Sequence, residues 1–297
     1  MASPEYQALV ARQAAATPPP PPADLHELRA RIEAAQGALP LADGTGATPV
    51  DAGGVAAILC ERDGGADDPV FVYFHGGGYR ICSALAYRSY GTHLARITKS
   101  RVLLVDYRLA PEHPFPAAVD DALAAYRYVL DHLADSSRVV FGGDSAGGGL
   151  TAALMLAARE AGLPQPAGGV LLSAWADLTN SSATYVDNAG TDRLFSKEMA
   201  DGAADLYLAG QAATNPLASP ALADWSGLAP ILVHVSADEV LLGDSVAVAA
   251  AARAAGVSVT YEEFPEMPHV WQISVPAFPE AVDSVEKIGA FVASVTA

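Results

Sequence analysis

The sequence predicts an α/β protein with a mostly parallel, doubly wound sheet, helices on both faces and a small helical cap. Short apolar runs alternate with longer helical patterns from residue 55 onward. Five of these runs are almost wholly apolar, which is typical of strands covered on both faces. With 297 residues, 51% of them hydrophobic, the chain is long enough for one large domain of this class with a substantial core.

The individual elements follow from the same alternation. Strands are expected where the apolar runs lie, at 55–60, 70–74, 102–106, 138–143, 169–173, 231–236 and 258–264. Helices are expected at about 87–98, 117–134, 146–161, 244–255 and 279–295. A strand–helix–strand order gives right-handed crossovers and therefore a parallel sheet.

Two segments interrupt this rhythm. Residues 1–40 carry two short helical patterns separated by a proline run at 18–22, which we interpret as a polyproline spacer. The stretch at about 180–218 has helical pieces but no strand, and is too long for a simple connection. We therefore expect N-terminal cap helices at 1–40 and a main domain at 41–297 that contains a cap insertion. Short helices are marginal alone, so we expect those of residues 1–40 to pack on apolar side chains of the insertion, namely Met199, Leu206, Tyr207 and Leu208.

The charge balance excludes some partners. The 17 Lys and Arg residues against 34 Asp and Glu residues give a net charge of −17, which disfavours nucleic acid, anionic membranes and anionic substrates. Only two cysteines occur, Cys60 and Cys82, which favours a reducing compartment. Neither a signal peptide nor a membrane span is expected, so the sequence predicts a cytoplasmic protein.

One motif predicts a nucleophile. The stretch "RVVFGGDSAGGGL" contains Gly143-Asp144-Ser145-Ala146-Gly147, a G-x-S-x-G that follows a predicted strand and opens a predicted helix. On such a sharp turn the serine is held out at the carboxyl end of the sheet, and the helix N-terminus favours a developing anion. A phosphate-binding reading lacks the lysine of a P-loop and the glycine spacing of a dinucleotide site. Ser145 is therefore the candidate nucleophile.

A serine hydroxyl needs a base to take its proton, and seven histidines compete for that role. His269 lies in "EEFPEMPHVWQ", a loop after the last predicted strand and before the last helix. This loop reaches the carboxyl edge of the sheet, whereas His234 lies inside a strand and His113 lies in a proline-rich loop. His269 is the candidate base.

An acid must hold the base in its correct tautomer. The segment "ILVHVSADEVLLGDS" offers Asp238, Glu239 and Asp244 after a strand. Asp238 and Glu239 are adjacent and cannot both point at the histidine. Asp238 is the closest to the strand end, so the sequence favours Asp238, with the other two expected to be solvated or to cap the next helix.

Three glycines follow the early strand in "VYFHGGGYRICS". A tetrahedral oxyanion needs two or three N–H donors aimed at one point. Glycine backbone can supply two of them, and the N–H of Ala146 supplies another. This predicts an oxyanion hole.

With these residues in place, the chain resembles the hormone-sensitive-lipase-like esterases, the bacterial family IV carboxylesterases. The resemblance covers nearly the whole chain and rests on "HGGGY" at 75–79, "DYRLAPEHPFPAA" at 106–118, "GDSAGG" at 143–148, "DEVLLGDS" at 238–245 and "MPHVW" at 267–271. It implies the α/β-hydrolase fold, with Gly77, Gly78 and Ala146 as oxyanion donors and a cap at 1–40 and about 180–218. The sequence departs from it at Cys82, where relatives often have glycine, and at Gly149, where many have asparagine. We expect Cys82 near the pocket entrance.

These observations together predict a serine carboxylesterase that hydrolyses small, uncharged and mainly apolar esters through an acyl-enzyme. Ser145 would attack, His269 would transfer the proton and Asp238 would orient the histidine. A lactone or amide hydrolase on the same residues is the nearest alternative, and a non-catalytic ligand receptor is another, against which the presence of His269 argues. No metal or organic cofactor is implied. The expected partner is a small-molecule ester or lactone, and the resemblance allows a homodimer.

Overall fold

The central sheet carries the site. The computed structural model describes residues 2–17 and 20–297, and within them one sheet has eight strands in the order β1-β2-β4-β3-β5-β6-β7-β8. Contacts of β1 with β2 and of β2 with β4 are antiparallel, and the other neighbours are parallel. The strands are β1 (Thr45–Asp51), β2 (Ala56–Arg62), β3 (Val70–Phe74), β4 (Arg101–Val105), β5 (Val139–Asp144), β6 (Gly168–Leu172), β7 (Ile231–Ser236) and β8 (Val259–Phe264).

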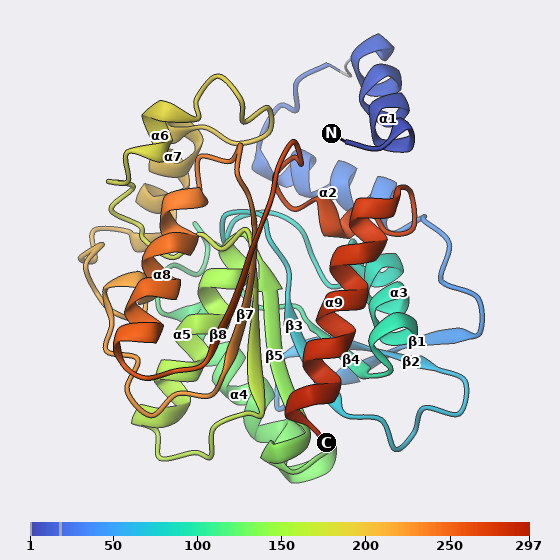
Figure 1. Ribbon diagram of the computed structural model, residues 1–297, viewed down its shortest axis with the longest axis vertical. Coiled ribbons are helices and arrows are strands. Elements are labelled where there is room, and N and C mark those ends of the chain that lie inside the picture. The colour runs from blue at the N-terminus through green and yellow to red at the C-terminus, as the bar shows by residue number, and fades with distance from the viewer. Residues whose placement is uncertain (1, 18–19) are drawn as a thin grey trace.

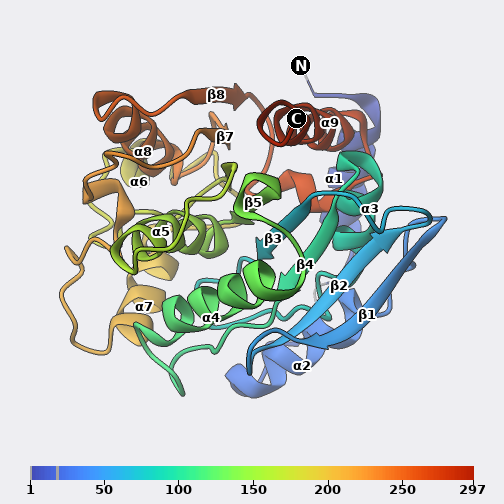
Figure 2. The ribbon, with the colours of Figure 1, turned by 90° about the horizontal axis from the view of Figure 1, so that it is seen from below.

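Helices cover both faces of this sheet. Helices α3 and α9 lie on one face, while α4, α5 and α8 lie on the other (Figures 1 and 2). The predicted doubly wound α/β fold is confirmed. Their bounds are α1 (Pro4–Ala15), α2 (Leu25–Gln36), α3 (Arg88–Thr98), α4 (Ala117–His132), α5 (Ala146–Glu160), α6 (Thr184–Asp187), α7 (Lys197–Leu208), α8 (Leu242–Ala254) and α9 (Pro279–Val295).

Strand β3 shows why its sequence is continuously apolar. All five of its residues are buried. Val70, Val72 and Phe74 pack in the cluster formed with α4, α5 and α8, whereas Phe71 and Tyr73 pack in the cluster formed with α3 and α9. Because successive side chains of a strand point to opposite faces, a strand covered on both sides needs an apolar residue at every position.

Every expected strand is present within one or two residues of its predicted bounds, and so is every expected helix of the main domain. Strand β1 was not predicted. Its sequence "TGATPVD" has few apolar residues and contains Pro49, because it pairs with β2 at the edge of the sheet, where proline and exposed side chains are tolerated.

Helices α1 and α2 are fastened to the main domain by polar contacts at the end of the molecule where β5 ends (Figure 1). Ser3 donates hydrogen bonds to the Glu280 carboxylate from its N–H and its hydroxyl, and the Tyr6 ring lies 5.1 Å from that of Phe278. On α2, the Arg29 guanidinium bonds to the Glu112 carboxylate at 2.8 Å and holds the pKa of that carboxyl at about 2. Neither helix has a buried residue.

The expectation that these helices pack on the apolar side chains of the insertion is wrong. Tyr207 and Leu208 of α7 are buried in the α4–α5 cluster, and the Tyr207 ring stacks on Tyr79 at 3.8 Å. Met199 and Leu206 are 44% and 37% exposed. Side chains of α1 and α2 pack instead on the α3–α9 cluster, so the two segments pack on different core clusters. Of the proline run, residues 18 and 19 lie outside the described residues.

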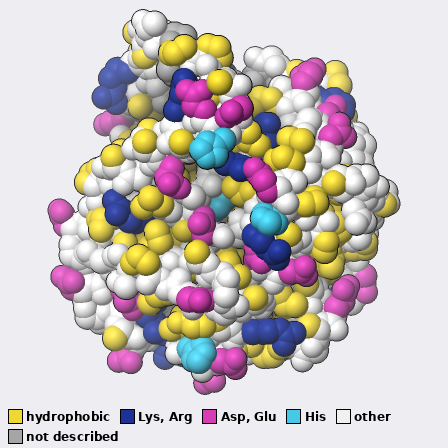
Figure 3. Space-filling view, turned by 180° about the vertical axis from the view of Figure 1, so that it is seen from behind, with side chains coloured by type: hydrophobic (Ala, Val, Ile, Leu, Met, Phe, Trp, Pro, Cys, Tyr) yellow, Lys and Arg dark blue, Asp and Glu magenta, His cyan; other side chains and the backbone are white. Residues whose placement is uncertain are grey.

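The excess of Asp and Glu over Lys and Arg in the sequence is visible on the surface. The view in Figure 3 shows Asp and Glu side chains spread over one face rather than gathered into a single patch. Among residues 2–17 and 20–297, no helix has the length and apolar character needed to cross a bilayer.

Candidate active site

Ser145 occupies a strained turn between β5 and α5. Its backbone has φ 53° and ψ −122°, a region that non-glycine residues rarely adopt. The turn is held by hydrogen bonds from the Ser145 N–H to the Leu172 carbonyl at 2.8 Å and from the Trp175 N–H to the Ser145 carbonyl at 2.9 Å. Gly147 lets the helix approach β3, because a Cβ there would lie 2.0 Å from the Phe74 carbonyl oxygen. Ser145 therefore lies on a sharp turn between a strand and a helix, as the sequence predicts.

His269 lies within hydrogen-bonding distance of this serine. Its Nε2 is 3.0 Å from the Ser145 Oγ. The loop that carries it follows β8 and is fixed by a hydrogen bond from the Ser236 hydroxyl to the Met267 carbonyl at 2.6 Å. The structure thus brings together the two residues that the sequence singled out from separate parts of the chain.

The expectation that Asp238 is the carboxylate beside the histidine is wrong. The Nδ1 of His269 lies 2.6 Å from Oε2 of Glu239, and the Glu239 side chain is 1% exposed. The other oxygen of Glu239 accepts hydrogen bonds from the Ser173 hydroxyl at 2.7 Å and from the Ser236 N–H at 2.8 Å. Nearness to the strand end did not decide the matter, because the chain turns after Ser236 and directs residue 239 back toward the sheet.

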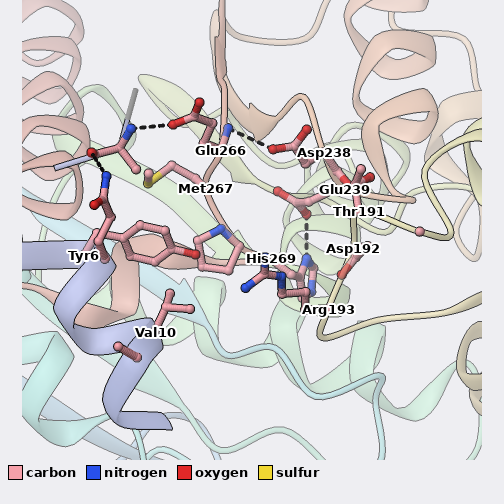
Figure 4. A pocket seen from close by; sticks show the side chains of 15 residues that line it. Tyr6, Val10, Thr191, Asp192, Arg193, Asp238, Glu239, Glu266, Met267 and His269 are labelled. Carbon is pink, nitrogen blue, oxygen red and sulfur yellow. Dashed lines mark hydrogen bonds and ion pairs between the residues drawn. The ribbon is translucent and has the colours of Figure 1, made fainter. Parts of the chain in front are cut away.

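Asp238 serves the same loop in another way. Its Oδ2 accepts a hydrogen bond from the N–H of Glu266 at 2.9 Å, on the outer side of the histidine loop. Figure 4 shows Asp238 directed toward Glu266 and Glu239 directed toward His269. The third candidate, Asp244, is buried in α8 and accepts hydrogen bonds from the N–H groups of Ala176 and Asp177.

The environment of His269 adjusts its proton affinity. Burial by itself lowers the pKa of this imidazole. The charge and hydrogen bond of Glu239 raise the pKa, and the charges of Asp192 and Asp144 raise it further. The net pKa is raised above the ordinary value of 6.5. The Phe195 ring from the insertion stacks on the imidazole at 5.5 Å with an interplanar angle of 15°.

The glycine loop after β3 lies beside this pair. Gly76 must be glycine because a Cβ there would lie 2.2 Å from Oδ2 of Asp144. Gly77 adopts φ +113°, a left-handed conformation that favours glycine. Among the hydrogen bonds between described residues, none is donated by the N–H of Gly77, Gly78 or Ala146. Three backbone donors in this loop and at the start of α5 are therefore available to a ligand.

A cavity of about 530 Å³ opens next to His269. Figure 4 shows Tyr6 and Val10 of α1 on one side, with Arg193 of the insertion and His269 on the other. Residues from the N-terminal helix and from the insertion thus face each other across the cavity, although they do not pack together. Its lining is mixed, with apolar atoms from Val10 and Met267 and charged groups at Asp192 and Arg193.

Cys82 lines a second cavity of about 480 Å³, beneath α1 and α2. Burial raises the pKa of its thiol to about 12. Its φ of +73° is left-handed, a conformation that favours glycine. Within the described part of the chain, no group of three or more His, Cys, Asp or Glu side chains is arranged to hold a metal ion.

Sequence reasoning missed three residues around His269 and Glu239. Ser173 holds Glu239, Phe195 stacks on His269, and Asp192 accepts a hydrogen bond from the N–H of Val240, next to Glu239. Ser173 is the last residue of the strand predicted at 169–173, and that position was a usable signal. Asp192 and Phe195 lie in the insertion, where no periodicity indicated which side chains face the site.

Known proteins resemble this chain along most of its length. A family model described as alpha/beta hydrolase fold matches residues 71–273. An acetyl-hydrolase of Streptomyces hygroscopicus is 42% identical over 230 residues, which cover 77% of each chain. The carboxylesterase/phospholipase LipF of Mycobacterium tuberculosis is 35% identical over 236 residues, covering 77% of this chain and 62% of its own. The crystal structure of an esterase from the bacterial hormone-sensitive lipase (HSL) family is 42% identical, with a TM-score of 0.93 over 100% of both chains.

Proposed function

Because the chain belongs to the α/β-hydrolase fold family, among the hormone-sensitive-lipase-like carboxylic ester hydrolases, we propose that Ser145, His269 and Glu239 form its catalytic triad. The observation that carries the proposal is the position of His269, with one ring nitrogen 3.0 Å from the serine hydroxyl and the other 2.6 Å from a buried carboxylate. A serine, a base and an acid in this relation are what nucleophilic ester cleavage requires. The acid is Glu239 rather than the Asp238 expected from the sequence.

The reaction follows from this geometry. Ser145 Oγ attacks the ester carbonyl carbon while Nε2 of His269 takes its proton. The negative charge that develops on the carbonyl oxygen is stabilised by the N–H groups of Gly77, Gly78 and Ala146. His269 then gives the proton to the leaving alkoxide, and an acyl-enzyme remains. A water molecule then attacks the acyl carbon while the same nitrogen takes its proton. The bond between the acyl carbon and Ser145 Oγ breaks, His269 returns the proton to Oγ, and the carboxylic acid is released.

Glu239 acts through the histidine. Its carboxylate accepts the hydrogen bond of Nδ1–H, which keeps Nε2 unprotonated and ready to accept the serine proton. When the imidazole becomes an imidazolium, the same carboxylate stabilises the positive charge. Two fixed donors, Ser173 and Ser236, hold the other carboxylate oxygen, so the acid cannot rotate away from the ring.

We further propose small, uncharged and mainly apolar esters as substrates. A volume of about 530 Å³ beside His269 suits a small molecule, and the net charge of −17 disfavours anionic ones. The cap role of α1 and the insertion belongs to this proposal, because both line the cavity, and so does that of α2, which lines the second cavity together with α1. A cytoplasmic location and a homodimer stay predictions from the sequence.

The triad is tested by Ser145→Ala, His269→Ala and the double variant, with p-nitrophenyl esters of graded acyl length. Each single change is expected to lower kcat by roughly 10⁴ or more, and the double change to cost little extra, because the two groups act as a unit. A phosphonate ester probe is expected to add to the wild-type chain at Ser145 and not to Ser145→Ala, read by mass spectrometry. Full activity in Ser145→Ala would refute the proposal. A panel of lactones and amides on the same enzyme separates the ester preference from the alternatives.

A further inference from the structure

A second buried carboxylate lies under the oxyanion loop and takes no part in the triad. Asp144, the residue before the nucleophile, is 1% exposed. Its two oxygens accept one hydrogen bond each, from the Tyr73 hydroxyl at 2.8 Å and from the Tyr87 hydroxyl at 2.8 Å. Burying a carboxylate is costly unless it is bonded, so its retention at this position calls for a reason.

Tyr87 connects this carboxylate to the glycine loop. Its hydroxyl donates to Asp144 and accepts a hydrogen bond from the N–H of Gly76 at 3.2 Å. The Gly76 backbone also passes so close to Asp144 that a Cβ would lie 2.2 Å from the carboxylate oxygen. The nucleophile turn and the loop that carries the Gly77 and Gly78 donors are therefore joined through one bonded group.

The same carboxylate acts on the histidine. Three carboxylates favour the imidazolium form of His269, namely Glu239 after β7, Asp192 of the insertion and Asp144 at the end of β5. Asp144 is the nearest of them in sequence to the nucleophile, because it precedes Ser145.

The protonation state of Asp144 allows this role. Burial raises the pKa of this carboxyl to about 6, although the hydrogen bonds of Tyr87 and Tyr73 and the charge of His269 lower it. Other groups that face it stay neutral, because burial raises the pKa of the Cys82 thiol to about 12 and raises that of the Tyr90 hydroxyl as well. The buried Tyr107 hydroxyl behaves in the same way. Near pH 8 Asp144 is therefore ionised.

We propose that Asp144 is a positioning residue of the esterase reaction, which ties the oxyanion loop to the nucleophile turn through Tyr87 and stabilises the imidazolium form of His269. The proposal rests on the proposed triad, since both effects act through Ser145 and His269. Asp144 is 1% exposed and so does not touch a substrate directly, and its effect is expected on the chemical steps rather than on substrate binding.

The test compares Asp144→Asn with the wild type in kcat, KM and the pH dependence of kcat/KM for p-nitrophenyl butyrate. Removal of the charge is expected to lower kcat about tenfold, with KM changed less than threefold. The acid limb of the profile is expected to move to lower pH by about half a pH unit or more, because the histidine loses a neighbour that favoured its protonated form. Asp244→Asn is the matched control. It replaces another fully buried carboxyl group, whose raised pKa of about 8 keeps it largely protonated over the acid limb, so its acid limb is expected at the wild-type position.

The tie to the loop is tested separately by Tyr87→Phe, with Tyr73→Phe as its control. Tyr87→Phe removes the bond to Gly76, so kcat is expected to fall about fivefold or more. Each tyrosine change also removes a hydrogen bond that lowers the pKa of Asp144, so the comparison of the two variants isolates the bond to Gly76. Tyr73→Phe leaves the Gly76 bond intact, so its kcat is expected to fall less than that of Tyr87→Phe. A folded Asp144→Asn with the wild-type acid limb, or a Tyr87→Phe with wild-type kcat, would overturn the proposal. If Asp144→Asn fails to fold, the two tyrosine variants decide. Ser145→Ala in the same assay distinguishes failure of the triad itself, because activity retained there would refute the proposed function instead.

Discussion

Replacing Glu239 by Gln is the sharpest single test of how the site works. The carboxylate oxygen Oε1 accepts two donors, the Ser173 hydroxyl and the Ser236 N–H, so the amide oxygen of Gln is expected to occupy that position. The amide NH₂ then faces Nδ1 of His269. A donor facing Nδ1 forces the proton onto Nε2, where the ring can no longer accept the proton of Ser145.

The size of the effect follows from this tautomer. Loss of the correct tautomer in a serine triad lowers kcat by roughly 10³–10⁴, about 4–5.5 kcal/mol of transition-state stabilisation. The pH profile should move too. Activity rises as His269 loses its proton, and Glu239 raises the pKa of that ring above 6.5, so the wild-type acid limb is expected above pH 6.5. Without the carboxylate, the residual activity should rise at lower pH.

Asp238→Asn is the matched control, because it makes the same chemical change in the adjacent residue. The Asn oxygen can still accept the N–H of Glu266, as Asp238 does now, so kcat is expected within about threefold of wild type. Steady-state kinetics with p-nitrophenyl butyrate from pH 5 to pH 9 measure both variants. If Asp238→Asn loses more activity than Glu239→Gln, the assignment of the acid is refuted.

Three other outcomes follow from the packing around the site. Gly76→Ala places a Cβ against the Asp144 carboxylate, so it is expected to cost about 1–3 kcal/mol and several degrees in Tm by thermal melting, while Gly202→Ala meets no atom within 4 Å and should melt no lower than wild type. Maleimide should label Cys82 slowly at pH 7, because burial raises the pKa of its thiol. Complete labelling should slow turnover, and Cys82→Gly should remove that sensitivity. Full activity of the labelled enzyme would place Cys82 away from the substrate path. Deletion of residues 1–23 removes α1, which has no buried residue but lines both cavities. The truncated enzyme should therefore stay folded and accept longer acyl chains, with a higher KM and an unchanged acid limb of the pH profile. Unchanged chain-length preference would show that α1 does not shape the substrate site.

The parts of the site that could be predicted are those fixed by local geometry. Ser145 stands on a turn that the flanking glycines make recognisable in sequence, and His269 is the histidine in the loop after the last strand. The acid was different. Asp238 and Glu239 differ by only one residue in their distance from the strand end. The turn after Ser236 decides which of the two carboxylates reaches the His269 ring. A turn of that kind depends on contacts with other elements, which no spacing records.

The contacts of Asp144 and of the insertion could not be predicted from the sequence, because they join residues far apart in the chain. Asp144 lies within the G-x-S-x-G motif, and its oxygens accept hydrogen bonds from two tyrosines, one in β3 and one directly before α3. Tyr207 of the insertion stacks on Tyr79, directly after the glycine loop, and not on the N-terminal helices. Through Tyr87, Asp144 connects the nucleophile motif to Gly76 of the glycine loop. The two glycine-containing motifs therefore act as one structural unit, and a change in either is expected to be felt at the oxyanion donors and at the nucleophile together.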